Sequence, residues 1–519
     1  MDIKKLFNLN YNYKKNNRWL FTNDRYRYVK TLRSLIYSKI LNEDFNFNPL
    51  VLTDKTKYEK NHIFSKSKIK IISLRQKLSF NQIKLIINVF FNIIYFYIRI
   101  IFKKNKVEWL INDFRLFDVH IGDIIYDFYI RYNHEYLKPK LFSLKFLKVL
   151  TGGIYKINFI NLYHSIYKPK MIITTSRGYA SIGNLLLRYG ARKKINTIYT
   201  GYNFNHLFNS YDKVFSHVYK VTKDKLDYCD KYISKKSINN FMKKRMIGKK
   251  HGFYTARKTL FKAYNKSIDD KFLSKIKLEK KNKKIIVVAL HCFSDAPHEA
   301  GRMIFNDYYD QFISTINFIN KNNSSKYFWI IKPHPARNVY GENGIIENYV
   351  KKFNFNNVVI CTSKIANNLL FKYTDYLVTA RSTIALEFAC FGKKSILSGE
   401  APYYFKDLFL KPKNREIYFN HLKNIEKINF SLNKKQIWFA KKILYILEFK
   451  TNVALPSSKF LPNPIGTPKL DIEKYYIKQL KENFKNNKKP LNYNDFKNDK
   501  FYKELKKEFK KINSGNRNI

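Results

Sequence analysis

The sequence predicts an α/β protein in which two Rossmann-like, doubly wound domains face each other across a cleft. The chain has 519 residues, which is too long for one ordinary core. Two segments alternate short apolar runs with amphipathic stretches, a pattern typical of parallel strands joined by helices. A charged stretch at residues 265–284, poor in long apolar runs, separates the two segments and predicts a linker between the domains.

The first predicted domain covers residues 106–264. Residues 171–175 (MIITT) are typical of a buried strand, and a short turn leads into a helical stretch that ends near Gly190, a suitable C-terminal cap. Residues 195–201 predict the next strand. Because the connections are short, we expect this strand–helix–strand unit to be parallel and right-handed.

The second predicted domain covers residues 285–415. A buried strand begins near Ile285, and later apolar runs (YFWII, NNVVICT, TDYLVTA and KSILSGE) alternate with helical stretches. Ligands of such domains lie at the carboxyl ends of the strands, so the interdomain cleft is the expected site.

The two ends of the chain show no such alternation. Residues 1–105 are basic and aromatic and predict an N-terminal helical extension. Residues 416–519 are Lys-rich and helical, and a helix returning to the first domain is expected there. We interpret the residues beyond about 485 as a solvated tail.

One strongly apolar segment, residues 83–102, lies within the N-terminal extension. It barely reaches the length and apolarity of a transmembrane helix and contains Asn88 and Asn92 at helical spacing. We interpret it as a buried helix or one lying on the membrane surface, with Lys103 and Lys104 beside lipid headgroups, and a true span as the alternative.

The amino-acid composition limits the classes of molecule that this protein is expected to bind. Lys and Arg number 99 against 39 acidic residues, which gives a net charge of +60, and the 45% of hydrophobic residues excludes a mostly disordered chain. Such a charge favours anionic lipids or other polyanions, although lysines spread over solvated faces also account for it. No motif for specific nucleic-acid binding accompanies the charge.

The cysteines and the N-terminal residues indicate the cellular compartment in which we expect the protein. Cys229, Cys292, Cys361 and Cys390 lie far apart and form no CxxC pair, which argues against disulfides and zinc and fits a reducing compartment. The N-terminus has no continuous apolar stretch of the kind found in secretory signals. We therefore expect a cytoplasmic protein, peripheral at the inner face of the plasma membrane.

The first motif is Lys332-Pro333-His334-Pro335 at the end of a predicted strand. Each proline fixes its own φ and restricts the residue before it, so the histidine lies in a rigid turn. Lys332 and His334 can both donate hydrogen bonds to phosphate oxygens. The alternative is a Pro-rich turn with an incidental histidine.

The second motif, Arg381-Ser382-Thr383, joins a strand to an amphipathic helix. Ser382 or Thr383 can cap that helix and direct hydroxyl and backbone N–H groups at a phosphate. Glu387 follows one turn later and can accept hydrogen bonds from ribose hydroxyls. The alternative is a capping motif with a solvent-exposed glutamate.

The third motif is the loop after the first strand of the second domain, which contains His291, Asp295 and His298. We expect this loop to bind substrate or to carry acid–base chemistry. A metal site is conceivable from these residue types, but their loop spacing does not favour one, and we expect no metal ion or other cofactor besides the donor co-substrate. A merely structural polar turn remains the alternative.

These motifs carry a resemblance to a known family. KPHP followed by TARSTIALEFACFGKKSILSGEAPYY resembles the capsule polysaccharide synthesis family that includes bacterial β-Kdo transferases, over roughly 285–410, with weaker similarity through 115–205. The His-Pro and Ser-Thr pairs also resemble motifs of bacterial sialyltransferases. The resemblance implies the GT-B architecture, in which the first domain binds the acceptor and the second binds the nucleotide-sugar donor.

The resemblance also implies residue roles. His334 and Pro335 would lie near the phosphate of a CMP-sugar, Ser382 and Thr383 on that phosphate, Glu387 nearby, and the reaction would be metal-independent. The acidic motif that supplies the sialyltransferase base is not evident here. Asp123, which follows Gly122 in a polar notch of the first domain, and Asp295 are the candidate bases. Arg177 and Tyr179 join Asp123 as residues expected to orient the acceptor.

The sequence thus predicts a glycosyltransferase that moves a sugar, Kdo-like and from a CMP-sugar, onto a capsular polysaccharide or lipid-linked acceptor. One alternative is a CDP-glycerol-type transferase, which shares the cytidine donor but moves a phosphoalcohol. A non-catalytic basic protein that binds polyanions or membranes is the other.

Overall fold

The structure is a computed structural model of the chain. It describes residues 11–23, 28–54, 69–74, 79–133, 139–200, 205–208, 210–215, 221–246, 266–299, 301–322, 324–361, 365, 367–449, 497–498 and 500–514.

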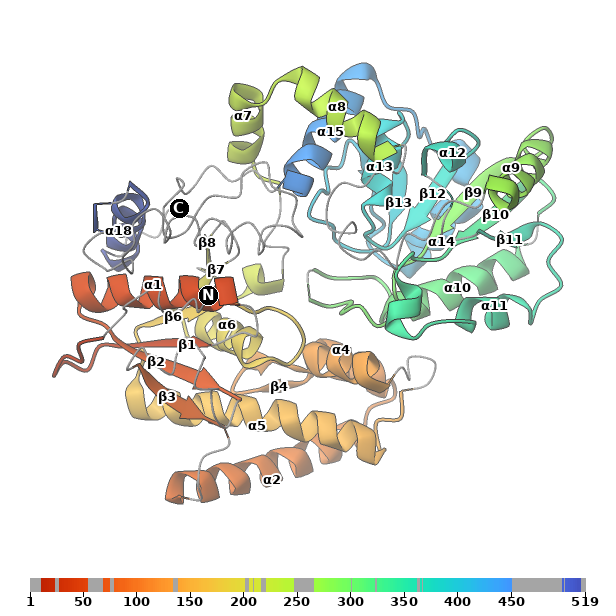
Figure 1. Ribbon diagram of the computed structural model, residues 1–519. Coiled ribbons are helices and arrows are strands. Elements are labelled where there is room, and N and C mark those ends of the chain that lie inside the picture. Colours follow the sequence, from red (N-terminus) through yellow and green to blue (C-terminus); the bar gives the residue numbers. More distant parts are fainter. Residues whose placement is uncertain are drawn as a thin grey trace.

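Two six-stranded sheets form the centres of two separate domains (Figure 1). The first sheet has the order β3-β2-β1-β6-β7-β8 and is parallel except for β8, which pairs antiparallel with β7. The second has the order β11-β10-β9-β12-β13-β14 and is parallel throughout. The predicted pair of Rossmann-like domains is therefore confirmed.

The N-terminal sheet draws its strands from two parts of the chain. Its strands are β1 (Trp19–Asn23), β2 (Asn48–Thr53), β3 (Lys70–Ser73), β6 (Met171–Thr174), β7 (Asn196–Thr200) and β8 (Asn205–Phe208). A short hairpin of β4 (Arg115–Leu116) and β5 (Val119–His120) lies apart from it. The helices are α1 (Tyr28–Phe45), α2 (Phe80–Ile101), α3 (Lys106–Asp113), α4 (Gly122–Asn133), α5 (Leu144–Tyr167), α6 (Ile182–Arg192) and the one-turn η3 (Asp212–Phe215).

The prediction that residues 1–105 form a separate extension is wrong. β1 pairs with both β2 and β6, so the chain's first described strand lies in the middle of the N-terminal sheet. Length does not distinguish these strands, since β2 has six residues like the predicted β9. β3 has four residues and begins with an exposed lysine.

The C-terminal domain is built around β9. Its strands are β9 (Lys284–Ala289), β10 (Tyr327–Lys332), β11 (Val358–Ile360), β12 (Tyr376–Thr379), β13 (Ser395–Leu397) and β14 (Phe409–Leu410). Its helices are α7 (Lys223–Tyr232), α8 (Lys235–Met246), α9 (Lys266–Glu279), α10 (Tyr308–Lys321), α11 (Ile345–Val350), α12 (Asn367–Phe371), α13 (Ile384–Cys390), α14 (Arg415–Lys423), α15 (Lys434–Phe449) and the one-turn η4 (Arg337–Tyr340) and η5 (Ile425–Lys427).

The domain boundary lies earlier than the predicted linker. Cys229 of α7 and Phe241 of α8 are buried in the core of the C-terminal domain, and Lys442 of α15 pairs with Asp230 at 2.9 Å. The charged stretch read as a linker contains α9, whose Ile276 is fully buried in the same core. Its charges occupy the solvent side of an amphipathic helix, which explains why it resembled a linker.

The last described helix, α18 (Lys500–Asn513), packs against the N-terminal domain rather than forming a solvated tail. Phe509 contacts the rings of Tyr37 and Phe45 of α1, and Tyr502 donates a hydrogen bond to Asp44. The expected helix returning to the first domain is present, but it lies beyond residue 485.

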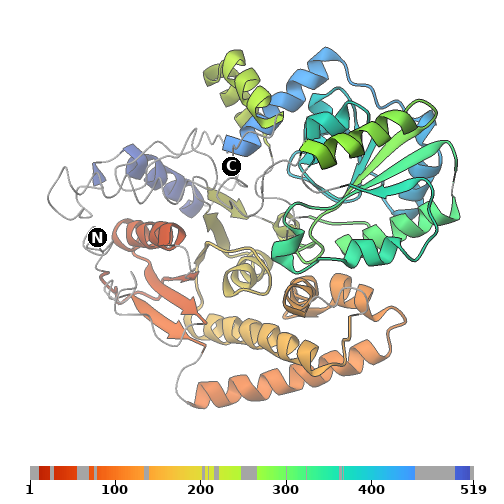
Figure 2. The ribbon, with the colours of Figure 1, turned by 45° about the vertical axis from the view of Figure 1, so that its right-hand side comes forward.

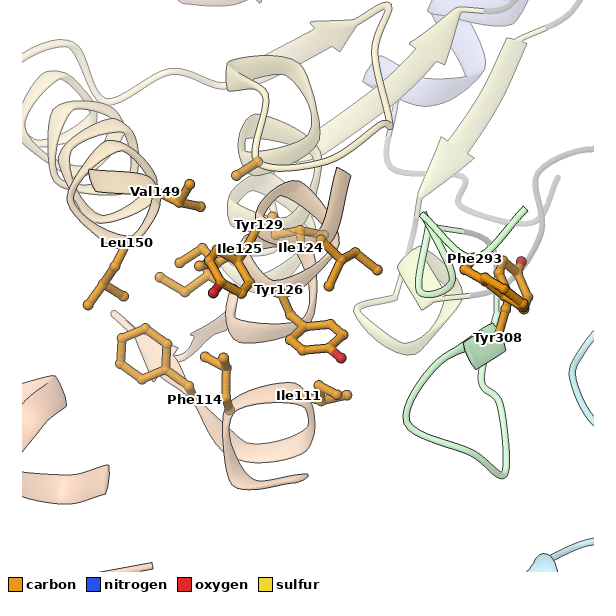
Figure 3. Packing of buried hydrophobic residues seen from close by; sticks show 14 of the residues in the cluster. Ile111, Phe114, Ile124, Ile125, Tyr126, Tyr129, Val149, Leu150, Phe293 and Tyr308 are labelled. Carbon is orange, nitrogen blue, oxygen red and sulfur yellow. The ribbon is translucent and has the colours of Figure 1, made fainter. Parts of the chain in front are cut away.

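The core of the N-terminal domain places α4 next to the domain interface. Ile125 and Tyr129 of α4 lie beside Val149 and Leu150 of α5 in the buried cluster shown in Figure 3. α4 begins at Gly122. Only glycine fits at this position, because a Cβ there would lie 1.8 Å from the carbonyl oxygen of Leu110. This close approach allows α3 and α4 to pack tightly against each other.

Candidate active site

Three loops that carry the sequence motifs lie at one edge of the C-terminal sheet. β9 is flanked by β10 and β12, and its last residue, Ala289, is in register with Lys332 of β10 and Thr379 of β12. The loops that begin at Leu290, Pro333 and Ala380 therefore leave the sheet side by side. The three motifs thus lie together at one edge of the sheet, as parallel register requires.

His334 is held as a neutral imidazole. Its Nδ1 accepts a hydrogen bond from the backbone N–H of Ala336 at 3.2 Å and lies 3.0 Å from Sγ of Cys292. Burial, opposed by nearby Asp295 and assisted by Lys332, lowers the pKa of His334 to about 4. Because Nδ1 accepts, the proton resides on Nε2, which is therefore a hydrogen-bond donor. Pro335 follows and is half-buried.

His291 lies behind His334 with its ring parallel to it at 6.3 Å between centroids. The other neighbour of His291 is Tyr308, whose ring stacks on it at 4.4 Å. Burial lowers the pKa of His291 well below its usual value, so this imidazole is also neutral. Its Nε2 is buried and has no hydrogen-bond partner among the residues described.

Lys332 and Arg381 support the loops instead of projecting freely from them. Lys332 is buried and donates to the carbonyl of Ile365 at 3.1 Å. Arg381 donates to the carbonyls of Pro297 at 2.6 Å and Gly301 at 3.3 Å, and its guanidinium lies over the ring of Tyr308. Both cations therefore position the backbone around the site in this conformation.

Ser382 and Thr383 precede α13. Ser382 is half-buried, and its carbonyl accepts a hydrogen bond from the hydroxyl of Tyr403. Thr383 is exposed and makes no side-chain cap to the helix, contrary to the capping alternative for that residue. Its hydroxyl is thus not used in helix capping.

Glu387 is occupied by protein partners, in contrast to the expected ribose contact. Arg245 of α8 bonds its Oε1 through Nε at 2.9 Å and Nη2 at 2.7 Å, and Asn367 donates to Oε2 at 2.5 Å. The carboxylate joins α8 and α12 to α13, so its observed role is structural.

His298 links the two domains through its side chain and its backbone. Its Nδ1–H donates to Oδ1 of Asp127 on α4 at 2.6 Å, and its backbone N–H donates to Oδ2 at 3.0 Å. Burial opposes the charged imidazole, but Asp127 outweighs that effect and raises the pKa of His298. Burial likewise raises the pKa of Asp127, against the opposing effect of His298. Among the described residues, none makes a hydrogen bond to Nε2 of His298.

Further contacts hold the same loop from the N-terminal domain. Tyr126 of α4 donates to Asp307 at 2.6 Å, and Arg177 donates to the carbonyl of Glu299 at 3.2 Å. The hydroxyl of Tyr179 lies 3.4 Å from the carbonyl of Ser294. Arg177 and Tyr179, predicted to orient the acceptor, therefore border the interface and contact the loop of the second domain.

Asp123 lies one turn before Asp127 on α4 and is bound on both oxygens by Arg188, at 2.6 and 2.8 Å. Burial raises the pKa of Asp123, but Arg188 outweighs it and brings the pKa down to about 2. A buried carboxylate with that pKa and both oxygens engaged is a poor proton acceptor. The geometry thus does not favour Asp123 as the base.

Two further acidic residues are Asp295, which belongs to the third loop, and Glu342, which bonds to that loop at Ser294. Asp295 is exposed and accepts a hydrogen bond from Tyr340 at 2.8 Å. Glu342 is buried and accepts from the backbone N–H of Ser294 at 3.1 Å and from its hydroxyl at 3.3 Å. Burial raises the pKa of Glu342 to about 7. Among the residues described, no group of three His, Cys, Asp or Glu side chains is placed to hold a metal ion.

Sequence reasoning missed Asp127 and Glu342. Asp127 repeats Asp123 at the i,i+4 spacing that puts both on one face of α4, and this spacing was the available signal. Glu342 lies in a loop with no local pattern, and only its burial against Ser294 distinguishes it.

Two Rossmann-like domains whose polar side chains meet at the carboxyl ends of the second sheet define the GT-B class of fold. Residues 209–427 match the family described as "Capsule polysaccharide biosynthesis protein". The resemblance seen in the sequence is confirmed over this segment. The matched segment begins close to the observed domain boundary and contains all three motifs.

Comparison with solved structures gave distant similarities. A β-Kdo 2,7 transferase, KpsC of Thermosulfurimonas dismutans, is 17% identical with a TM-score of 0.21, over 35% of this chain and 53% of the other. This chain thus spans about half the length of that relative. A KpsC β-Kdo 2,4 transferase from the same organism is 11% identical over 53% and 79%, with a TM-score of 0.25. Anabaena Alr3699/HepE, solved with UDP and glucose, is 12% identical over 90% and 100%, with a TM-score of 0.26. No curated protein sequence matched.

Proposed function

We propose that this protein is a glycosyltransferase of surface polysaccharide synthesis, which transfers a Kdo-like sugar from a CMP-sugar to a polysaccharide or lipid-linked acceptor. The observation that carries the proposal is the Asp127–His298 pair, which spans the domain interface. Its histidine lies in the loop after β9, next to the loop of His334 after β10. The family match over residues 209–427 supports the polysaccharide context.

The donor half of the proposed site uses His334, Ser382 and Thr383. In sugar transfer, negative charge builds on the departing phosphate as its bond to the anomeric carbon breaks. A neutral His334 with its proton on Nε2 can donate to that phosphate without titrating near neutral pH. Donors held in place before the reaction stabilise the transition state more than the ground state.

The acceptor half uses His298 as the general base. Asp127 binds its Nδ1–H and orients the ring, which leaves Nε2 to take the proton of an acceptor hydroxyl. The acceptor oxygen then bonds to the anomeric carbon, and the bond between that carbon and the phosphate breaks with its electron pair leaving on CMP. Asp127 stabilises the imidazolium that results, consistent with the raised pKa of His298.

This assignment replaces Asp123 and Asp295 as the proposed base. Arg188 occupies both oxygens of Asp123, whereas Asp295 is exposed and already accepts a hydrogen bond from Tyr340. We expect the reaction to proceed without a metal ion, because protein donors can stabilise the phosphate charge. Full activity in a metal chelator is the check on that expectation.

The experiment combines ligand binding with turnover. Thermal shifts with CMP, UMP, GDP and UDP are measured on the wild-type protein and on His334→Ala, and CMP release from a CMP-sugar is then followed. Selective stabilisation by CMP that the variant loses, with sugar transfer, supports the proposal. CMP release with phosphoglycerol transfer from CDP-glycerol would identify the polyol-phosphate alternative. A folded protein that none of the four nucleotides stabilises would contradict both the sugar transferase and the polyol-phosphate transferase as functions of this protein.

A further inference from the structure

Helix α2 has one face in the protein and another that is apolar and exposed. Its inner face, formed by Gln82, Leu85, Val89, Phe96 and Ile100, is buried along the helix. In both ribbon views α2 lies at the outer edge of the N-terminal domain alongside α5 (Figures 1 and 2). The packing therefore extends over almost the whole length of α2 on one side only.

Polar contacts reinforce this docking of α2 on the domain. Asn92 donates to Asn158 of α5 at 3.2 Å, and Tyr155 of α5 donates to Gln82 at 2.9 Å. Tyr97 donates to the carbonyl of Leu141 at 3.4 Å. Asn92, one of the two asparagines that weaken the apolar character of this segment, thus joins it to the domain.

The outer face of α2 is apolar at helical spacing. Its exposed residues, which we call the α2 outer face, are Phe80, Ile83, Ile86, Ile87, Phe90, Phe91, Ile94, Ile98, Ile101 and Phe102. Phe91 is 62% exposed, and the two end residues, Phe80 and Phe102, are 81% and 82% exposed. The ring centroid of exposed Phe142 lies 5.7 Å from that of Tyr97 on α2, so Phe142 adjoins this helix. Contiguous apolar surface of this kind marks an interaction site.

Basic side chains border the α2 outer face. Lys84 and Arg99 are exposed on the helix itself, which contains no acidic residue, and Lys103 and Lys104 follow it. Arg99, Lys103 and Arg115, together with one acidic residue, Asp113, also line a cavity of about 370 Å³ at the end of the helix. An apolar helix face flanked by cations is complementary to a bilayer with anionic headgroups. The acyl chains contact the apolar residues, and the lipid phosphates pair with the cations.

We propose that the α2 outer face binds an anionic lipid bilayer and that α2 lies in the plane of the membrane without crossing it. By length and composition α2 could span a bilayer, and it is the one helix in the described part of the chain that could. A span would have to pull its inner face out of the protein core and break the bonds of Asn92 and Gln82. This inference stands independently of the proposed reaction.

The first test is binding of the full-length protein to vesicles of phosphatidylcholine, alone or mixed with phosphatidylglycerol. We expect binding to the anionic vesicles, reduced by high salt. Phe91→Glu should weaken it about tenfold or more, because an inserted apolar ring is replaced by a charge. Leu278→Glu, which changes a residue that is 64% exposed on α9 of the other domain, is the matched control and should bind normally.

The second test distinguishes lying on the membrane from crossing it. Single cysteines are placed at Phe80 and Phe102, at opposite ends of α2, and inverted membrane vesicles are treated with an impermeant thiol reagent. The native cysteines are all buried, which favours selective labelling of the new thiols. Labelling of both positions from one side supports the proposal, whereas labelling of only one would establish a span and overturn it.

A third outcome assigns the surface to a different occupant. If the protein self-associates in solution, if Phe91→Glu abolishes that association and if no vesicle binding is found, the α2 outer face is a contact between two copies of the chain. That result would overturn the membrane proposal.

Discussion

Asp127 on α4 and His298 in the loop after β9 are joined at 2.6 Å although they come from different domains and lie 171 residues apart in the chain. The carboxylate is fully buried, and the histidine side chain is only slightly exposed. Because each domain supplies one member, the oriented histidine exists only when the two domains are in contact. Contact between the two domains is thus required to assemble the proposed base.

Replacing Asp127 with Asn should lower kcat by about 10²–10⁴-fold, the usual contribution of a positioned acid–base group. The base must be neutral, so kcat should rise with pH through the raised pKa of His298. Without the carboxylate that pKa falls, and the rising limb moves to lower pH. Rates of CMP release measured across pH would show this shift.

Tyr126→Phe is the control for the loss of an interdomain hydrogen bond. Tyr126 lies on the same helix and bonds to Asp307 of the other domain, but it does not contact His298 by a hydrogen bond. We expect less than about a tenfold loss of kcat, in line with one neutral bond. An equal loss in both variants would mean that Asp127 only holds the domains together.

His334→Ala should lower kcat by about 10²–10³-fold, the cost of one donor to a developing oxyanion. The pKa of about 4 predicts that His334 contributes no pH dependence between pH 5 and 8. Cys292→Ala, which changes the neighbour of Nδ1 and leaves Nε2 intact, should retain most of the rate. Unchanged turnover in a folded His334→Ala protein would remove His334 from the mechanism.

Arg188→Met should destabilise the protein by about 3–5 kcal/mol, because it leaves the buried carboxylate of Asp123 without its partner. The pKa of Asp123 is lowered to about 2, so its stabilising effect is present above the unfolded value near 3.8 and is lost as pH falls toward 2. Urea unfolding at several pH values measures both effects. A stable but inactive Asp123→Asn variant would instead restore Asp123 as the base.

Glu342→Gln should make the protein more stable at pH 8 by up to roughly 3 kcal/mol. Burial raises the pKa of Glu342 from 4.5 to about 7, so stability is greatest below pH 4.5 and falls as pH rises through 7. Gln cannot ionise yet keeps an acceptor for Ser294. Thermal melting of both proteins from pH 5 to 8 should show curves that diverge with pH. Parallel curves would mean that Glu342 does not titrate in this range.

The strands of the C-terminal sheet were predictable from sequence because a strand covered on both faces is a continuous apolar run, as in residues 285–289. β1 and β3 escaped prediction because they are bordered by charged or polar residues. The membership of α7 and α8 in the second domain escaped as well, since their apolar positions do not say which core they enter.

Within the candidate site, the three motifs were predictable as neighbours because parallel strands end at one edge and each motif follows a strand. The roles of the individual residues in the candidate site were less predictable from the sequence. Glu387 has the position of a ligand-binding residue in the motif, but Arg245, 142 residues away, occupies it. The acidic pair on α4 was visible as a spacing, yet nothing local distinguishes Asp123, bound by Arg188, from Asp127, bound by His298.

The sequence by itself determined the local conformations that short-range physics controls: the apolar strands, the Pro-constrained turn of His334 and the amphipathic character of α2. The tertiary structure alone decided which polar groups are paired and which remain available for chemistry. That choice depends on burial and on partners many residues away, because a buried charge is stable only beside the group that packing brings to it. The periodicity of apolar residues along the chain does not indicate which distant residue that partner is.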